Sequence, residues 1–324
     1  MVPAPFSALV GQTQAVTLLT QAVVRQRVAP GYLFVGAEGV GRALAAAAFA
    51  ECLLTPAAAA APPAALRRRI ASRNHPDLLW VEPTYLHQGR PLTVAEAAES
   101  GLKRRGRPQI RLAQIREIAR FLGQPPLEAA RAVVVIEQAE LMAEAAANGL
   151  LKTLEEPGRA TVILITGNLQ ALLPTLVSRC QTVPFERLSA ANLAQVLQQN
   201  GRTEILESAE ILALAQGSPG AAIAHWQQQQ ALPDGFLARV EQLPQSRREA
   251  LETAREIVQT LDTEAQLWLL DYLLQQCWQQ SMPIAQLQQL EQARKYLLSY
   301  VQPRLVWETL LMQQATARSA GQSR

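Results

Sequence analysis

The segment that most constrains the fold is GYLFVGAEGVGRALA, residues 31–45. A short apolar run ends at Gly36, further glycines follow at Gly39 and Gly41, and an Ala-rich stretch over 42–54 predicts a helix. Strand, glycine loop and helix in this order are the context of a phosphate-binding loop. In such a loop, backbone N–H groups and the N-terminus of the helix surround the phosphates.

Two positions depart from the phosphate-loop pattern G-x-x-x-x-G-K-[ST]. Arg42 stands at the position of Lys, and Ala43 stands at the position of Ser or Thr. Arg42 keeps a positive charge, but its planar fork does not replace a compact ammonium group. Ala43 has no oxygen with which to hold Mg²⁺. The loop alone leaves two interpretations open, a plain glycine turn or a degenerate phosphate loop, and the order of the neighbouring elements favours the second.

Further apolar runs predict a parallel sheet flanked by helices. β-Branched residues fill 133–136, and we expect the remaining strands at 31–36, 77–83, 160–166 and 181–185. Helical patterns lie between them, so the N-terminal part is predicted to be an α/β domain. The expected helices cover residues 7–25, 42–54, 110–122 and 141–155, the expected loop 55–66, and a long polar connection 84–109.

The strands are predicted to cease after Phe185. We expect three domains: an α/β domain over 1–187, a small helical domain over 188–230, and an all-helical domain over 231–324 with Trp268 and Trp278 in its core. The composition is that of a globular protein, and a net charge of +3 does not require a nucleic-acid partner.

The cysteines and the N-terminus predict a cellular location. Cys52, Cys180 and Cys277 lie far apart, which indicates neither a disulfide framework nor a Cys-x-x-Cys metal clip. Neither a signal peptide nor a long apolar span is evident. We therefore expect a cytoplasmic protein without a membrane partner.

Two further motifs bear on phosphate chemistry. Glu137 and Gln138 follow the strand at 133–136, where P-loop ATPases carry an acid that binds Mg²⁺ and often a second that activates water. Gln138 can orient water but cannot accept its proton. Arg179 precedes the last strand, and its spacing leaves open a solvated residue or one that reaches the γ-phosphate of a neighbouring subunit.

Other polar residues have plainer interpretations. His75 is expected to be structural, because no metal-ligand partners accompany it in the sequence. The basic run Lys103–Arg107 is interpreted as a solvated loop, with contact to DNA phosphates as the alternative.

Several motifs occur together in one order and carry a resemblance. They are FSALVGQTQAVTLLTQAV, RNHPDLLWVEP, IRLAQIREI, AEAAANGLLKTLEEP, LLPTLVSRCQ and GSPGAA, spread over about residues 6–225. In this combination the chain resembles the AAA+ clamp-loader family of bacterial DNA polymerase III, and within it the delta prime type.

The resemblance implies an AAA+ module with a helical lid and a helical collar that joins five subunits in an open ring. Such a ring places the sliding clamp on primed DNA, with ATP bound by gamma or tau subunits and with delta as a further partner. The chain would then be a rigid, non-hydrolysing part of the DNA polymerase III holoenzyme. Its Ser-Arg-Cys arginine maps onto Arg179, which would reach the ATP of the adjacent subunit.

Two departures from the family pattern lead to further expectations. Many members carry a four-cysteine zinc module where this chain has only Cys52, so we predict no zinc and no other metal. The turn after Gly-Ser-Pro carries Gly220, Ala221 and Ala222 instead of a phosphate-sensing arginine. We therefore expect no intrinsic ATPase activity and leave weak nucleotide binding open. The alternatives are a self-contained AAA+ ATPase with an atypical loop and a protein–protein adaptor without phosphate chemistry.

Overall fold

The computed structural model describes residues 4–56, 62–100, 107–156, 158–242, 244 and 246–321. The chain divides after Val196 into an N-terminal and a C-terminal unit. The domain boundaries expected at 187/188 and 230/231 stay predictions.

A five-stranded parallel sheet forms the centre of the N-terminal unit, in the order β2-β5-β6-β1-β7. Every residue of β5 and β6 is buried, as expected for strands covered on both faces. The predicted α/β class with a parallel sheet is therefore confirmed. The strands are β1 (Gly31–Val35), β2 (Leu78–Val81), β5 (Ala132–Ile136), β6 (Ala160–Thr166) and β7 (Gln181–Pro184).

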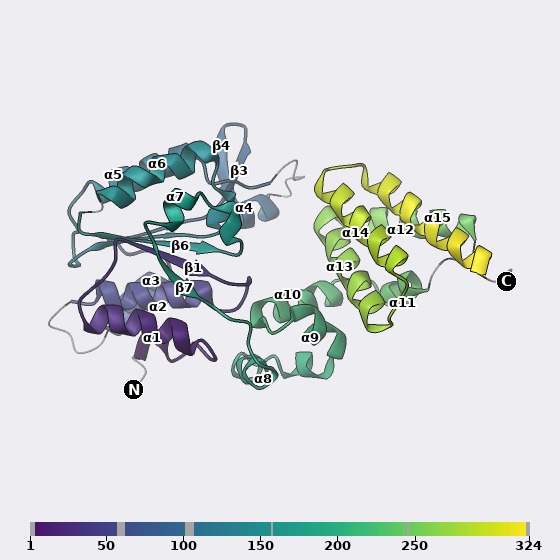
Figure 1. The fold of residues 1–324 in the computed structure, drawn as a ribbon, viewed down its shortest axis with the longest axis horizontal. Coiled ribbons are helices and arrows are strands. Elements are labelled where there is room, and N and C mark those ends of the chain that lie inside the picture. The colour runs from purple at the N-terminus through teal and green to yellow at the C-terminus, as the bar shows by residue number, and fades with distance from the viewer. Residues whose placement is uncertain are drawn as a thin grey trace. The chain divides into compact units, whose positions relative to one another are not determined.

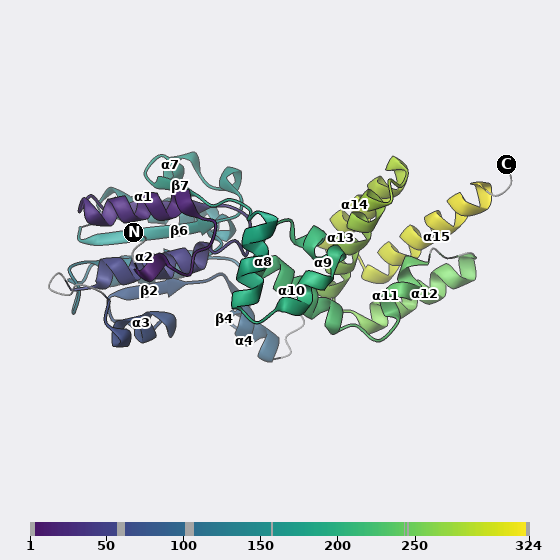
Figure 2. The same cartoon turned by 90° about the horizontal axis from the view of Figure 1, so that it is seen from below.

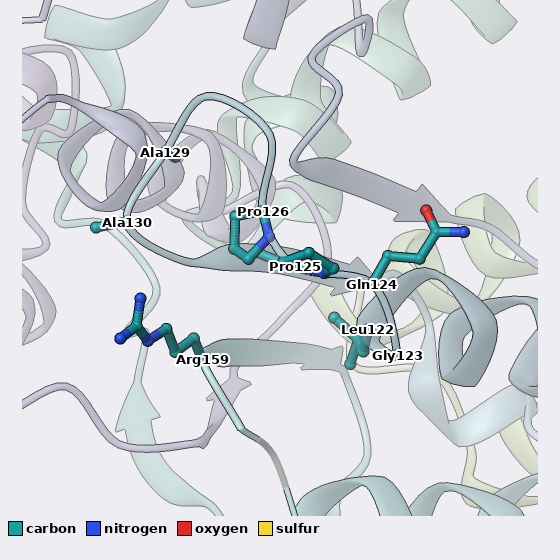
Figure 3. A pocket seen from close by; sticks show the side chains of 9 residues that line it. Leu122, Gly123, Gln124, Pro125, Pro126, Ala129, Ala130 and Arg159 are labelled. Atoms are coloured by element: carbon teal, nitrogen blue, oxygen red, sulfur yellow. The ribbon is translucent and has the colours of Figure 1, made fainter.

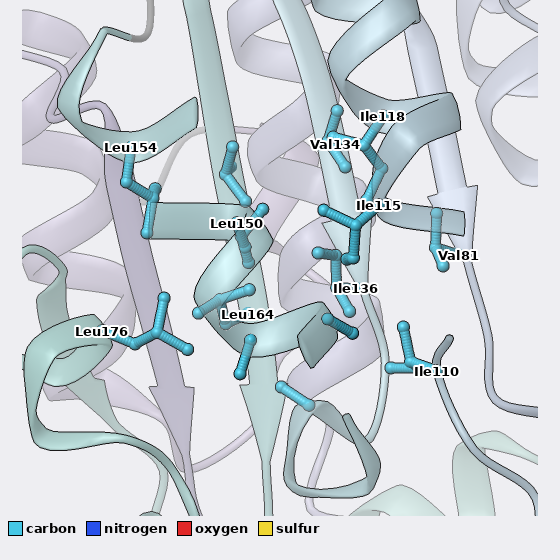
Figure 4. Packing of buried hydrophobic residues seen from close by; sticks show 14 of the residues in the cluster. Val81, Ile110, Ile115, Ile118, Val134, Ile136, Leu150, Leu154, Leu164 and Leu176 are labelled. Atoms are coloured by element: carbon cyan, nitrogen blue, oxygen red, sulfur yellow. The ribbon is translucent and has the colours of Figure 1, made fainter. Parts of the chain in front are cut away.

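Helices cover both faces of this sheet (Figure 1). On one face lie α1 (Thr13–Val24) and α2 (Arg42–Leu54), with α3 (Ala64–Ala71) beside α2. On the other lie α5 (Leu112–Leu122) and α6 (Glu144–Glu155). Apolar side chains from α5 and α6 pack on β5 and β6 and form the main core of this unit (Figure 4).

Two predicted segments carry more regular structure than expected. The connection over 84–109 contains an antiparallel hairpin of β3 (Thr84–His87) and β4 (Arg90–Thr93), followed by α4 (Val94–Glu99). Its turn is Gln88–Gly89, where both residues have positive φ, as tight hairpin turns require. The loop expected over 55–66 already enters α3 at Ala64. Most of the basic run Lys103–Arg107 and part of the alanine-rich loop lie outside the described residues.

Two helices begin later than the periodicity predicted. The helix expected over 7–25 begins at Thr13, because Gly11 takes a φ of 76° and Gln12 is held by contacts elsewhere in the unit. The helix expected from 141 is preceded by the short 3-10 turn η2 (Ala139–Leu141) and begins at Glu144. Between β6 and β7 lie η3 (Leu169–Ala171) and the single-turn helix α7 (Pro174–Val177).

No described residue after β7 lies in a strand, as predicted. In the C-terminal unit α13 packs against α14, and α12 packs against α15 (Figure 2). The indole of Trp307 is fully buried and donates its N–H to Gln266 Oε1 at 2.9 Å. The elements after β7 are α8 (Ala190–Gln199), η4 (Thr203–Glu207), α9 (Ala209–Ala215), α10 (Pro219–Gln230), α11 (Phe236–Glu241), α12 (Arg247–Thr260), α13 (Thr263–Gln279), α14 (Ile284–Leu298) and α15 (Pro303–Gly321).

One of the two tryptophans expected in the core of this unit is on its surface. Trp268 is buried, whereas Trp278 is 68% exposed near the C-terminal end of α13. Among the helices that the structure describes, none has both the length and the apolar character needed to cross a bilayer.

Candidate functional site

The glycine loop over 36–41 lies at the carboxyl edge of the sheet, between β1 and α2. Gly39 and Gly41 have φ values of 77° and 102°, a region that side chains rarely adopt. Gly36 is required for a different reason, because a Cβ there would lie 2.4 Å from the carbonyl oxygen of Phe185. The sequence therefore needs glycine at all three positions in order to build this loop.

Gln12 fixes the loop to the rest of the unit, a role that sequence reasoning missed. Its buried amide donates to the carbonyl oxygen of Val40 at 3.1 Å and to that of Glu186 at 2.8 Å. It also accepts from the N–H of Glu186 at 3.1 Å. Its place in the quoted motif FSALVGQTQ, directly before α1, was the only signal.

Arg42 is the first residue of α2, and its side chain is buried instead of projecting into solvent. Burial lowers the pKa of Arg42, and the carboxylates of Glu140 and Glu38 partly oppose this effect. Its Nη1 is buried without a hydrogen-bond partner. The next residue, Ala43, is exposed and offers no oxygen to a metal ion.

Glu137, which follows β5, lies at the same edge of the sheet, but its carboxylate already accepts hydrogen bonds from other side chains. Oε1 of Glu137 accepts from Trp80 Nε1 at 2.6 Å and from Arg73 Nη2 at 3.1 Å. The guanidinium of Arg73 stacks over the Trp80 ring at 4.7 Å from its centroid. Gln138 has a φ of 46° and turns the chain into η2. Arg73 and Trp80 were not singled out from the sequence.

The residues at this edge do not fit a magnesium nucleotide, the group that the fold implies for a phosphate loop. Ala43 lacks the metal-binding hydroxyl, and the oxygen of Glu137 that faces Trp80 and Arg73 is engaged. The carboxylate of Glu140 also lies at this edge, where it accepts from the N–H of Gly167 at 3.0 Å. A negative charge at this place opposes the binding of phosphate.

Arg179 lies at the opposite, amino edge of the sheet. It precedes β7, and its carbonyl oxygen lies near Gly31, the first residue of β1. From Gly31 to Val35, β1 crosses roughly 13 Å, at ~3.3 Å per residue. The structure therefore brings residues 36–43 together with Glu137 and Gln138, but it places Arg179 apart from them.

The side chain of Arg179 is held at the surface by two contacts within its own unit. Its Nη1 donates to the carbonyl oxygen of Thr175 at 3.1 Å, and its Nη2 pairs with Glu155 Oε1 at 2.8 Å. The side chain of Arg179 remains 38% exposed. The adjacent Cys180 packs against Gly31, and burial raises the pKa of its thiol to about 11. Cys180 is therefore a protonated packing residue near neutral pH.

A second polar cluster at the amino edge is structural. His75 is buried, and its Nδ1 accepts from the N–H of Asp77 at 3.1 Å. The Asp77 carboxylate in turn accepts three backbone N–H groups of the loop before β5, a role that sequence reasoning missed. Among the described residues, no three His, Cys, Asp or Glu side chains are grouped as metal ligands. The absence of zinc stays a prediction.

One pocket of this unit lies beside the loop between α5 and β5 (Figure 3). Its volume is ≈ 370 Å³, and Ala132 at the start of β5 and Arg159 before β6 belong to its wall. It therefore opens at the amino edge of the sheet and does not contain the candidate phosphate site. The remaining lining residues are Leu122, Gly123, Gln124, Pro125, Pro126, Ala129 and Ala130.

Residues 11–189 match the sequence model described as DNA polymerase III, delta subunit. The chain belongs to this family. Residues 191–314 match a second model, described as the C-terminal domain of cyanobacterial DNA polymerase III delta prime.

Relatives of this family carry the delta prime name, as the motifs predicted. The chain is 34% identical to DNA polymerase III subunit delta' of Bacillus subtilis over 55% of its own length and 48% of that protein. It is 37% identical to the delta' subunit of Pseudomonas aeruginosa over 60% of its length and 55% of that protein. The matches thus span about half the length of these relatives.

A solved structure supports the fold of this family member. A DNA polymerase III gamma subunit-related protein from Thermotoga maritima superposes with a TM-score of 0.53 at 18% identity, covering 94% of this chain and 99% of that one. At this identity the likeness concerns the fold alone. The predicted fold, a parallel sheet flanked by helices and followed by further helices, is confirmed.

Proposed function

We propose that this chain is a clamp-loader subunit of DNA polymerase III that does not hydrolyse ATP itself and donates Arg179 to the ATP of an adjacent subunit. The observation that carries the proposal is the position of Arg179 at the amino edge of the sheet. β1 separates this residue from the glycine loop of its own unit by roughly 13 Å. Arg179 therefore suits a phosphate on another molecule.

The chemistry of the side chain supports this role. An arginine that reaches a transferring γ-phosphate in trans neutralises the negative charge that develops there. The guanidinium of Arg179 is part exposed, and its ion pair with Glu155 is also exposed to solvent. Exposed pairs of this kind are weak, so a phosphate group can replace Glu155 as partner at little cost.

The state of the chain's own loop supports a non-hydrolysing role. Ala43 cannot hold Mg²⁺, Glu137 is engaged by Trp80 and Arg73, and Gln138 cannot accept a proton. We therefore assign ATP binding to neighbouring gamma or tau subunits. Delta, the sliding clamp and primed DNA are the further partners, in a five-membered ring located in the cytoplasm.

The domain arrangement belongs to the same proposal. Residues 1–187 form the AAA+ domain, 188–230 the helical lid, and 231–324 the collar through which the subunits associate. Gly220, Ala221 and Ala222 lie at the start of α10, and none of them carries a charged group that could bind a phosphate.

The experiment replaces Arg179 by Ala in a loader reconstituted with gamma or tau, delta and this chain. Gel filtration should show that the assembly forms normally, whereas its ATP turnover should fall. An arginine of this kind raises the rate of hydrolysis at the site it serves by ~10³-fold or more. Arg159→Ala is the matched control, since Arg159 is exposed at the same edge of the sheet.

Three outcomes separate the candidate functions. A loss with Arg179→Ala but not with Arg159→Ala supports the proposal. Unchanged turnover in an intact assembly refutes it and favours an adaptor without phosphate chemistry. ATP hydrolysis by the isolated chain at ~1 s⁻¹, an ordinary enzymatic rate, favours a self-contained ATPase.

A further inference from the structure

A second pair of charged residues lies at the carboxyl edge, independent of Arg179. Glu140 belongs to η2, and its Oε1 accepts from the N–H of Gly167, directly after β6. A Cβ built on Gly167 would lie 3.3 Å from this oxygen and 3.9 Å from Arg42 Nη1. It would also lie 3.8 Å from the carbonyl oxygen of Gly36. The guanidinium, the carboxylate and the start of the glycine loop therefore meet around one point.

Each of the two charged groups has a buried atom without a hydrogen-bond partner. These atoms are Nη1 of Arg42 and Oε2 of Glu140. Arg42 is only 8% exposed, so little solvent compensates its charge. A buried cation of this kind requires an anion nearby. Among the carboxylates that act on Arg42, Glu140 has the largest effect.

The same place is where a phosphate group would bind in a working loop of this type. Arg42 is the first residue of α2, and the first N–H groups of a helix have no partner within it; Gly41 at the N-cap has no side chain that could bond to them. Arg42 would supply the positive charge. Glu140 brings a negative charge to this point from inside the chain.

We infer that Glu140 excludes phosphate-type anions from the glycine loop by acting as the internal counter-charge of Arg42. On this basis the carboxylate of Glu140 opposes phosphate binding in addition to the departures from the loop pattern at Arg42 and Ala43. A phosphate oxygen within about 4 Å of this carboxylate would be repelled strongly enough to weaken binding by on the order of 10²–10³-fold. Without the charge of Glu140, the N-terminus of α2 and Arg42 form an anion site.

The experiment compares binding of inorganic pyrophosphate to the full chain by isothermal titration calorimetry, without magnesium and without partner subunits. The wild-type chain should show no binding at about 1 mM. Glu140→Gln keeps an oxygen that can accept from Gly167, and it should bind at least ~100-fold more tightly than the wild type. Adding Arg42→Gln to this variant should abolish the gain.

Glu144→Gln removes another carboxylate, exposed at the start of α6, and should behave as the wild type. Wild-type binding as tight as that of Glu140→Gln overturns the inference, as does a folded Glu140→Gln chain that fails to bind. If the Glu140→Gln chain does not fold, binding to Glu140→Ala is measured in its place. Failure of both variants to fold would make Glu140 a structural requirement and overturn the inference.

This test is independent of the arginine-finger proposal. It uses the isolated chain and an anion, whereas the test of Arg179 uses turnover in the assembly. Either result can fail without affecting the other.

Discussion

Replacing Asp77 by Asn should destabilise the loop between α5 and β5 more than any exposed charge in the same region. The buried carboxylate of Asp77 accepts from Leu127 N at 2.6 Å through Oδ1, and from Glu128 N at 2.8 Å and Ala129 N at 2.7 Å through Oδ2. Asparagine can direct its single oxygen to two of these donors, but its NH₂ group then faces the third. One charge-assisted bond is lost and two become neutral, which costs about 2–4 kcal/mol.

Hydrogen exchange of the backbone amides of residues 127–129 is the most direct assay. Because 1.4 kcal/mol corresponds to a factor of ten, these amides should exchange roughly 30- to 700-fold faster in Asp77→Asn. The control is Glu128→Gln in the same loop, whose side chain makes an exposed ion pair with Arg69. It should leave these rates nearly unchanged. Equal rates in wild type and Asp77→Asn would refute the structural role assigned to Asp77.

The effect of Asp77 should also depend on pH in a defined direction. Burial alone would raise the pKa of Asp77, but the three backbone N–H groups and His75 together hold it below its usual value of 3.8. A carboxylate with a lowered folded-state pKa stabilises the protein above its unfolded pKa, and this contribution is lost as the pH falls through the folded pKa. The stability difference between wild type and Asp77→Asn should therefore be constant from about pH 7 to 5 and shrink below about pH 4.

Two further substitutions test the packing of each unit. Gly36→Ala places a Cβ 2.4 Å from the Phe185 carbonyl oxygen, so the end of β1 must move away from the residues that follow β7. Urea unfolding should show a free energy of unfolding lower by about 1–3 kcal/mol. An unchanged unfolding midpoint would contradict this steric reasoning. Gln266→Leu removes the acceptor of the buried Trp307 N–H, and the same assay should show a loss of about 1–3 kcal/mol. A stabilised Gln266→Leu chain would show that the apolar gain exceeds the cost of the unpaired indole.

Local patterns were sufficient to predict the sheet of the N-terminal unit. The strand expected over 160–166 agrees residue for residue with β6, and the four β-branched residues at 133–136 lie in β5. Both strands are buried on two faces, so their apolar runs have no polar interruption. The hairpin of β3 and β4 escaped prediction because its strands are short and largely exposed, and therefore lack this signal.

The partners of the site residues could not be predicted, because they lie far away along the chain. Glu137 bonds to Trp80, 57 positions earlier, and Gly167 bonds to Glu140, 27 positions earlier. The sequence pattern at 137–138 predicts an altered acidic motif, but only the register of β2 and β5 brings Trp80 to it. The surroundings of Arg42 likewise come from distant parts of the chain, because Gly167 after β6 and Glu140 after β5 lie near it.

The two edges of the sheet carry separable properties, and this follows from its parallel strands. The carboxyl ends of β1, β5 and β6 gather the glycine loop, Glu137 and Glu140, whereas the amino ends of β1 and β7 lie beside Arg179. The residues that affect phosphate affinity at the carboxyl edge do not contact Arg179 at the amino edge. Under the two proposals made above, Glu140 and Ala43 act against nucleotide chemistry at the carboxyl edge, while Arg179 serves a neighbour from the amino edge. An anion site gained in Glu140→Gln would not by itself make the chain an ATPase. Such a chain would still lack the hydroxyl group that binds the metal ion and the carboxylate that activates water.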